Sequence, residues 1–281
     1  MTIICLCAME EEACHLREAI SRTYEMWGCP CEDKPIKGVA RRTVFPELHL
    51  EVIITNVGTA HAAMACTAVL LEPRPEPVRA VISCGCSGAH HASFNPGDVV
   101  VGTAIASPGQ CKEKLGEVEF EGFRLGFNST LGATLPCDPF LVEAAMQAAA
   151  EAGLREANSS VDPSACKPVT LPRWPGAQAP PAVIKGVVAS DDAWCCEPIN
   201  IARCRQAFHS VCEEMEAGAV AVVCKTFGVP FVAIKDISNN ELTMPQPGLA
   251  AEEPLLVHEI GKRAALLTMA LILKLKDEAV R

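Results

Sequence analysis

The sequence predicts an α/β fold: a single domain in which helices flank a central sheet that is mixed but largely parallel. Short apolar runs alternate along the chain with longer segments of helical periodicity, an order typical of βα units. The apolar runs are rich in Val and Ile and alternate little with polar residues, which is typical of strands covered on both faces. With 49% hydrophobic residues in 281, the chain can also build a full core.

The expected elements follow one another from the N-terminus. We predict strands over residues 2–8, 50–56, 79–84, 98–105, 182–190 and 229–237, and helices over 11–21, 59–71, 139–152, 212–227 and 253–276. Gly58 and Gly228 mark helix boundaries. Residues 156–181 hold six prolines and no periodicity. We interpret this stretch as a surface insertion within one domain over 1–281, because a strand resumes the sheet directly after it.

The net charge restricts the binding partners that we expect, and the cysteine content indicates the cellular compartment. The chain has 24 Lys+Arg against 34 Asp+Glu, a net charge of −10. We therefore expect no nucleic-acid partner and no membrane partner, since both surfaces attract clustered basic residues. The 16 cysteines include no CxxC pair and follow no basic leader, so we expect reduced thiols in a cytoplasmic protein. Cys5/Cys7 and Cys84/Cys86 each share one strand face and are expected to be small core residues.

Polar side chains gather next to several predicted strands, where an open α/β sheet binds its ligands. The first strand is followed by Ala-Met-Glu-Glu-Glu at residues 8–12, the third by Cys-Gly-Cys-Ser-Gly at 84–88, and the fifth by Asp-Asp-Ala-Trp at 191–194. The last strand is preceded by Glu-Glu-Met-Glu at 213–216, inside an otherwise apolar segment, and followed by Ser-Asn-Asn at 238–240. We therefore expect the ligand site at this edge of the sheet.

These segments, in this order, resemble the purine nucleoside phosphorylase/uridine phosphorylase superfamily, and most closely its methylthioadenosine/S-adenosylhomocysteine nucleosidases. Each motif alone has low specificity, but five in the correct order make a specific match that covers nearly the whole chain outside the proline-rich stretch. The resemblance implies cleavage of the N-ribosidic bond of a purine nucleoside, without a cofactor, by a homo-oligomer, most commonly a dimer. The matching stretches are residues 8–12, 56–63, 81–88 with 96–100, 188–194, and 214–219 through 228–238.

The resemblance also implies roles for individual residues. Glu216 matches the carboxylate that accepts both ribose hydroxyls, and Met215 matches the residue that packs on the ribose. Glu12 matches the base that activates the attacking water. Trp194 falls where a residue stacks on the purine, and the backbone of Cys195 then faces the purine edge. The alternatives are a charge that stabilises a helix start for Glu12 and a core position for Trp194.

The sequence departs from the nucleosidase pattern at the residue that is expected to contact N7 of the purine. The nucleosidases carry an aspartate after Ile-Ser, whereas this chain has Asn239 after Ile237 and Ser238. An amide donates a hydrogen bond but has no proton to give to N7. The 6-oxopurine phosphorylases have asparagine at this place, so Asn239 favours inosine- or guanosine-like substrates, with Ser238 orienting the neighbouring side chain. Asp236 is no substitute, because strand alternation sends it to the face opposite Lys235 and Ile237.

A second departure concerns the oxygen nucleophile. The nucleosidases place an arginine at the position of Lys235 and a small hydroxyl residue near Cys86, so Lys235 and the adjacent Ser87 are expected to hold the water or anion. The arginine-containing phosphate loops of the phosphorylases have no match after the first or third strand, although Arg41 and Arg42 could reach a neighbouring subunit's phosphate site. Water is therefore the expected nucleophile.

Two other functions remain open. One is a phosphorolytic enzyme that uses inorganic phosphate. The other is a nucleoside-binding or storage protein of this fold, with its chemistry weakened at Asn239. A metal site at His90 and His91 is not expected, because no carboxylate or cysteine follows with ligand spacing.

Overall fold

The computed structural model describes residues 1–24, 31–115, 117–126, 129–156, 181–195, 197–242 and 259–279. The predicted proline-rich insertion at 156–181 lies almost wholly outside these residues, as does the first part of the helix predicted over 253–276.

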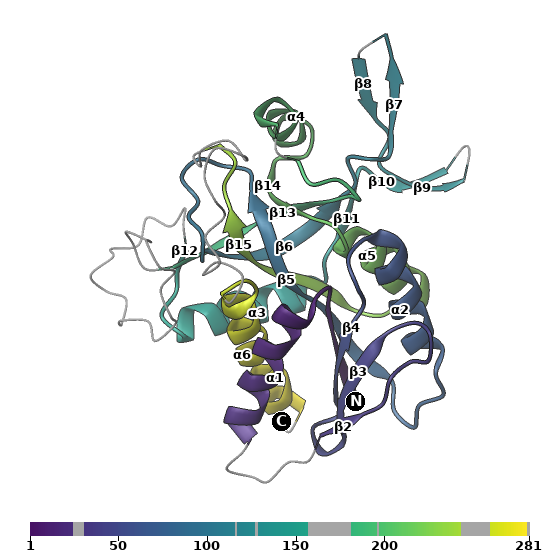
Figure 1. Cartoon of the computed structure of the whole chain (residues 1–281), viewed down its shortest axis with the longest axis vertical. Coiled ribbons are helices and arrows are strands. Elements are labelled where there is room, and N and C mark those ends of the chain that lie inside the picture. The colour runs from purple at the N-terminus through teal and green to yellow at the C-terminus, as the bar shows by residue number, and fades with distance from the viewer. Residues whose placement is uncertain are drawn as a thin grey trace.

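A mixed sheet forms the centre of the molecule (Figure 1). Its strand order is β11-β6-β13-β14-β5-β1-β4-β3-β2, with β12 beside β13 and β15 joining β5 to β6. Parallel pairs link β4, β1, β5 and β15, and β6, β13 and β14, so the predicted mixed, largely parallel sheet is confirmed. The central strands are β1 (Thr2–Cys7), β4 (Leu50–Ile54), β5 (Val78–Ala89), β6 (Val99–Ala106), β13 (Ala182–Ser190), β14 (Ser210–Glu214) and β15 (Phe231–Asn239), and the outer ones are β2 (Glu32–Asp33), β3 (Arg41–Phe45), β11 (Thr134–Pro136) and β12 (Arg155–Glu156).

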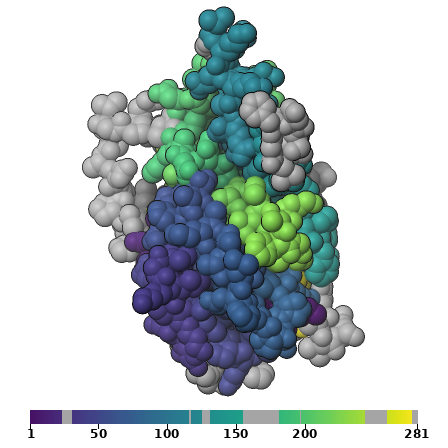
Figure 2. Space-filling view, turned by 90° about the vertical axis from the view of Figure 1, so that its right-hand side faces the viewer, coloured from purple at the N-terminus to yellow at the C-terminus, as the bar shows by residue number. Residues whose placement is uncertain are grey.

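Helices cover both faces of the sheet. α1 (Glu10–Tyr24), α3 (Pro139–Glu151) and α6 (Lys262–Ala279) pack together on one side, and α2 (Thr59–Leu71) packs with α5 (Ala217–Phe227) on the other (Figure 1). Figure 2 looks onto the second side, where α5 is the yellow-green surface beside the blue surface of the N-terminal third. Because both faces are covered, residues such as Ile4, Ile53 and Val81 are completely buried.

Several elements of the structure were not predicted, because their sequences contain no long apolar run. The hairpins β7 (Cys111–Lys114)–β8 (Glu117–Phe120) and β9 (Phe123–Gly126)–β10 (Ser129–Gly132) extend away from the sheet (Figure 1). α4 (Pro198–Phe208) and the 3-10 turn η2 (Pro46–Leu48) are likewise short and partly polar.

One predicted element is wrong. The helix predicted over 212–227 is in fact strand β14 followed by α5, which begins at Ala217. Residues 210–214 alternate between buried and half-buried side chains, as a strand does. The helix then begins where the Glu214 carboxylate accepts the N–H groups of Glu216 and Ala217. The boundaries at Gly58 and Gly228 are confirmed, since Gly58 precedes α2 and Gly228 ends α5 in the left-handed conformation.

Every cysteine in the described part of the chain is free. Cys5, Cys7 and Cys84 are buried in the core, as expected of small apolar residues, whereas Cys86 is only half-buried, so its predicted core position is wrong. No helix among the described residues is long and apolar enough to cross a membrane.

Candidate active site

A cavity of about 220 Å³ opens at the carboxyl ends of β1, β5 and β15. The loop after β13 and the turn between β14 and α5 complete its wall. The predicted site residues, which are far apart in sequence, therefore lie together. Cys195 and Lys235 alone among them do not line this cavity; those that do are Glu12, Cys86, Ser87, Trp194, Met215, Glu216, Ser238 and Asn239.

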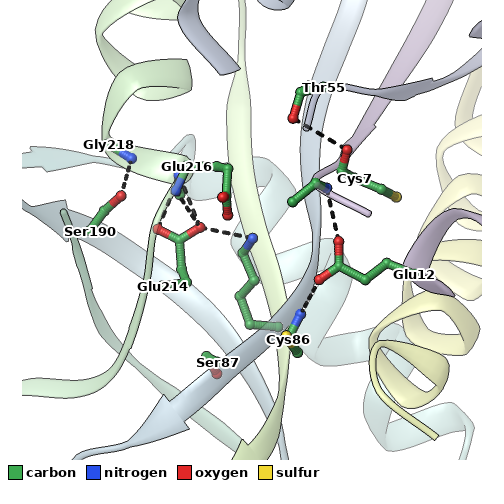
Figure 3. Close-up of polar contacts among 12 residues, drawn as sticks. Cys7, Glu12, Thr55, Cys86, Ser87, Ser190, Glu214, Glu216 and Gly218 are labelled. Atoms are coloured by element: carbon green, nitrogen blue, oxygen red, sulfur yellow. Dashed lines mark hydrogen bonds and ion pairs between the residues drawn. The ribbon is translucent and has the colours of Figure 1, made fainter. Parts of the chain in front are cut away.

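Glu12 lies in the first turn of α1 and is 3% exposed. Its Oε2 accepts the backbone N–H groups of Ala8 (2.8 Å) and Met9 (3.1 Å). Its Oε1 accepts the backbone N–H of Cys86 at 2.9 Å (Figure 3). The carboxylate thus joins the end of β1 to β5 in a fixed orientation. Gly85 makes this approach possible, because a Cβ there would overlap the Glu12 carboxylate.

Glu216 faces the cavity from the start of α5 and is 8% exposed. Its Oε1 accepts the backbone N–H of Gly58 at 2.8 Å. Burial, and next the negative charge of Glu214, raise the pKa of Glu216 to about 7, while Lys235 and the Gly58 N–H act in the opposite direction. Glu216 therefore changes its charge near neutral pH.

Lys235 lies below the cavity wall and is paired with a carboxylate. It is 3% exposed, and its Nζ is 2.9 Å from Oε2 of Glu214. Burial lowers the pKa of Lys235, but the carboxylates of Glu214, Glu216 and Glu12 more than offset this and raise it above its usual value. The ammonium group is thus charged and paired with Glu214. That Lys235 helps to hold the water or anion stays a prediction.

Trp194 is 63% exposed and forms part of the cavity wall, so the alternative of a core tryptophan is wrong. Its loop is tied to the start of α2, since Asp192 accepts both the backbone N–H (2.7 Å) and the hydroxyl of Thr59. The sequence placed Asp192 in the polar segment after the fifth predicted strand but gave this residue no role.

Ser238 and Asn239 end β15 at the cavity. The Ser238 hydroxyl is 2.7 Å from Oδ1 of Asn239, and the Asn239 amide donates to Glu241 Oε1 at 2.9 Å. Because the Glu241 carboxylate can only accept, the amide nitrogen of Asn239 must face it. Asp236 lies on the opposite face of β15, where it accepts the N–H groups of Gly261 and Arg263 at the start of α6; its predicted orientation is confirmed.

The two residues expected near the nucleophile are also engaged by the protein. The hydroxyl of Ser87 donates to the backbone carbonyl of Asp236 at 3.1 Å. Burial, followed by the charges of Glu12 and Asp236, raises the pKa of the Cys86 thiol well above its usual value. Cys86 therefore contributes its backbone N–H to Glu12 and a neutral thiol to the cavity wall.

The remaining candidates lie elsewhere. Arg42 pairs with Glu51 and Glu72, and Arg41 lies 2.9 Å from Glu10, so neither lines the cavity. Across the described residues, His, Cys, Asp and Glu side chains form no group of three that could hold a metal ion.

Glu213 is a cavity residue that the sequence interpretation missed. Its Oε1 accepts the backbone N–H of Cys195 at 2.9 Å, and its Oε2 is 3.3 Å from Nε2 of His90, a completely buried side chain. The carboxylates within an otherwise apolar segment were the available signal, but the predicted helix placed Glu213 on the wrong element.

Known proteins share both the sequence pattern and this architecture. Residues 2–275 match the phosphorylase superfamily. A 5'-methylthioadenosine/S-adenosylhomocysteine nucleosidase of Bacillus thuringiensis is 28% identical over 243 residues, covering 85% of this chain and 86% of the relative. The nucleosidase of the same name from Campylobacter jejuni superposes with a TM-score of 0.67 at 19% identity, covering 99% of both chains. A futalosine hydrolase of Helicobacter pylori gives 0.65 at 20% identity, covering 99% of this chain and 98% of the other.

The superfamily match extends over nearly the whole chain and includes each segment that builds the cavity, so this protein belongs to the phosphorylase superfamily.

Proposed function

We propose that this protein is a purine nucleosidase, which hydrolyses the N-ribosidic bond of a purine nucleoside. The observation that carries the proposal is that Glu12 and Glu216 line one cavity together with Trp194 and Met215. Cleavage of such a bond develops positive charge on the ribose while electrons move into the purine. A site for it needs a carboxylate at the sugar hydroxyls, a base for the nucleophile and a surface for the purine.

In the proposed reaction, Glu12 takes a proton from water as the water oxygen bonds to C1′. The bond from C1′ to N9 breaks and its electron pair enters the purine, which leaves as an anion and takes a proton from solvent, while Glu12 returns its proton to solvent. The products are ribose and the free base. Glu216 accepts the ribose hydroxyls, Met215 packs on the sugar, and Trp194 stacks on the purine. The amide of Asn239, with Ser238 beside it, donates to the N7 side and stabilises the departing base without transferring a proton.

Water is favoured over phosphate by the charge of the cavity. Four glutamates line it, and no lysine or arginine does so in the described part of the chain. An anionic nucleophile would be repelled by these carboxylates, and the ammonium group of Lys235 beneath them is already paired with Glu214. The nucleosidase names of the sequence relatives support the same choice.

The substrate is proposed to be an inosine- or guanosine-like nucleoside, with methylthioadenosine-like nucleosides as weaker substrates. Asn239 supports this order, because an amide matches the acceptors N7 and O6 of a 6-oxopurine but cannot protonate a leaving adenine. The structural neighbours include both methylthioadenosine/S-adenosylhomocysteine nucleosidases and a futalosine hydrolase, so they do not select one substrate.

The deciding experiment is a panel of inosine, guanosine, adenosine and methylthioadenosine, each with and without inorganic phosphate. We expect free base and free ribose without phosphate, fastest from inosine or guanosine. Production of ribose 1-phosphate only when phosphate is present would instead identify a phosphorylase. Tight nucleoside binding without base release from any member would identify a binding protein.

We further propose a homodimer formed through the α2–α5 side of the molecule. Large apolar side chains are exposed there: Val57 just before α2, Met64 and Leu71 on α2, and Phe227 on α5. Val57 also lines the cavity, so a second copy on this surface would lie beside the site. Light scattering is expected to give twice the chain mass, and Met64→Lys is expected to reduce it to one chain.

The free thiols support a reducing compartment, and we propose that the protein is cytoplasmic. Localisation of a tagged full-length chain tests this.

A further inference from the structure

We infer that Glu213, oriented by His90, reads the six-membered ring of the bound purine and selects bases that carry an N–H at ring position 1. The inference rests on the proposed function only in taking the cavity to bind a purine. It adds a specificity-determining side chain from β14 and a positioning residue behind it.

Glu213 and Asn239 approach the cavity side by side. Both side chains line the cavity, and both lie next to Gly88. A Cβ atom added at Gly88 would lie 3.4 Å from Asn239 Nδ2 and 3.5 Å from Glu213 Cγ. With the ribose at Glu216 and the N7 edge at Asn239, the six-membered ring extends toward Glu213 and the Cys195 backbone. One edge of the base therefore meets an amide donor first and a carboxylate acceptor next.

His90 supplies the support behind Glu213. It is completely buried; its Nδ1 is 2.8 Å from the Ser210 hydroxyl, and its Nε2 is 3.3 Å from Glu213 Oε2. The second contact is within ion-pair distance but does not have hydrogen-bond geometry, and Nε2 has no other hydrogen-bond partner among the described residues. A buried nitrogen in this state is satisfied by a small rotation of the carboxylate toward it. Such a rotation would orient Glu213 through Oε2 while its Oε1 keeps the Cys195 N–H.

The chemistry of the two purine classes decides what Glu213 admits. An ionised carboxylate only accepts hydrogen bonds. Ring position 1 of hypoxanthine or guanine carries a proton and can donate to it, whereas the same position in adenine carries a lone pair and is repelled. Cys195 N–H, a donor suited to an adenine lone pair, is already bonded to Glu213. A site that accepts a hydrogen bond from an N–H group of the base discriminates against a base that lacks this N–H.

The test is calorimetric binding of three free bases: hypoxanthine, adenine and 1-methylhypoxanthine. Wild-type protein is expected to bind hypoxanthine at least tenfold more tightly than the other two, as for a charge-assisted hydrogen bond. Glu213→Gln is expected to reduce the hypoxanthine-to-adenine ratio at least tenfold, because the amide can donate to adenine. The matched control is Glu117→Gln on the exposed hairpin strand β8, which is expected to keep the wild-type ratio.

His90 is tested by rescue. His90→Phe is expected to weaken hypoxanthine binding severalfold and to leave adenine binding unchanged, and His90→Gln, which keeps a donor toward Glu213, is expected to restore most of the loss. A positioning role predicts this selective effect, whereas a purely structural role would weaken both bases equally. An equal loss therefore removes His90 from the inference.

Two outcomes overturn the selectivity role of Glu213. One is an unchanged base ratio in Glu213→Gln. The other needs no variant: the wild type fails to bind hypoxanthine more tightly than both adenine and 1-methylhypoxanthine. Failure of the proposed function is distinguishable: if the bases bind in the expected order but no nucleoside is cleaved, the nucleosidase proposal fails and the inference stands.

Discussion

The ammonium group of Lys235 lies 2.9 Å from Glu214 Oε2, and both side chains are almost completely buried beneath the candidate site. Glu214 also accepts the N–H groups that begin α5, so one carboxylate serves both the helix start and the ion pair. Without the lysine charge, Glu12, Glu214 and Glu216 would face one another in a poorly solvated space. We interpret Lys235 as the counterion that lets the carboxylates gather.

The first prediction concerns this pair. Lys235→Met leaves Glu214 as an uncompensated buried charge, and breaking a buried pair in this way costs about 3–5 kcal/mol. The free energy of unfolding from denaturant titration is expected to fall by that amount. The double variant Lys235→Met/Glu214→Gln is expected to recover part of the loss. A loss below about 1 kcal/mol in the single variant would contradict the counterion role of Lys235.

The second prediction assigns the base. Glu12→Gln is expected to lower kcat by about 10²–10⁴-fold, which is the usual contribution of a general base, while nucleoside binding persists. The matched control is Glu11→Gln, since Glu11 lies in the same helical turn but is exposed. Steady-state kinetics and calorimetry separate the two effects. Retained turnover in Glu12→Gln would exclude Glu12 from the base role.

The third prediction follows from the close approach of Gly85 to Glu12. Gly85→Ala adds a Cβ where the Glu12 carboxylate lies, so the side chain must move away from the Cys86 N–H. We expect kcat to fall by 10-fold or more, because catalytic groups tolerate displacements of only about 1 Å. If the two changes act on one group, Gly85→Ala adds little further loss in a Glu12→Gln background. Full additivity would refute the connection.

The sequence predicted the sheet well because the signals were local. The strand over 182–190 and the helix over 59–71 have the predicted bounds, since a buried run of Val and Ile and a segment bounded by glycine each fix their own structure. The prediction of the start of α5 failed because the signal there was not local. Residues 212–216 read as a continuation of the apolar helix, and only the tertiary pairing of β14 with β13 and β5 makes them a strand.

The sequence predicted that most of the candidate site residues lie close together, as they do around the cavity, but it did not predict their contacts. Motif order gave the segments that meet at the cavity, because the ends of parallel strands share one edge of a sheet. The partners of those residues depend on contacts across the fold: Glu214 with Lys235, Asp192 with Thr59, and Glu213 with the Cys195 backbone. Such pairs span tens of residues or more, and no spacing within one segment reveals them.

The fourth prediction concerns Asn239. Asn239→Asp places a carboxylate beside Glu241, and the repulsion favours the protonated form of the new side chain, which can then protonate N7. Activity on adenosine and methylthioadenosine is expected to rise at least tenfold relative to inosine. Adding Glu241→Gln removes the repulsion and is expected to move the basic limb of the pH–rate profile to lower pH. Wild-type protein that already strongly prefers methylthioadenosine would contradict this interpretation of Asn239.

The last prediction is a pH dependence of nucleoside binding. Burial and the nearby Glu214 raise the pKa of Glu216 to about 7, and only the ionised carboxylate can accept both ribose hydroxyls. The ionised fraction therefore rises with pH, from about one-tenth at pH 6 to about nine-tenths at pH 8, and the apparent Kd is expected to fall about tenfold over that range. Calorimetry with the Glu12→Gln variant measures this without turnover. Glu216→Gln in the same background is expected to bind the nucleoside weakly and without this pH dependence. Asp236 is a second group to consider, because burial also raises its pKa to about 7. A pH dependence that survives Glu216→Gln would show that Glu216 is not its source.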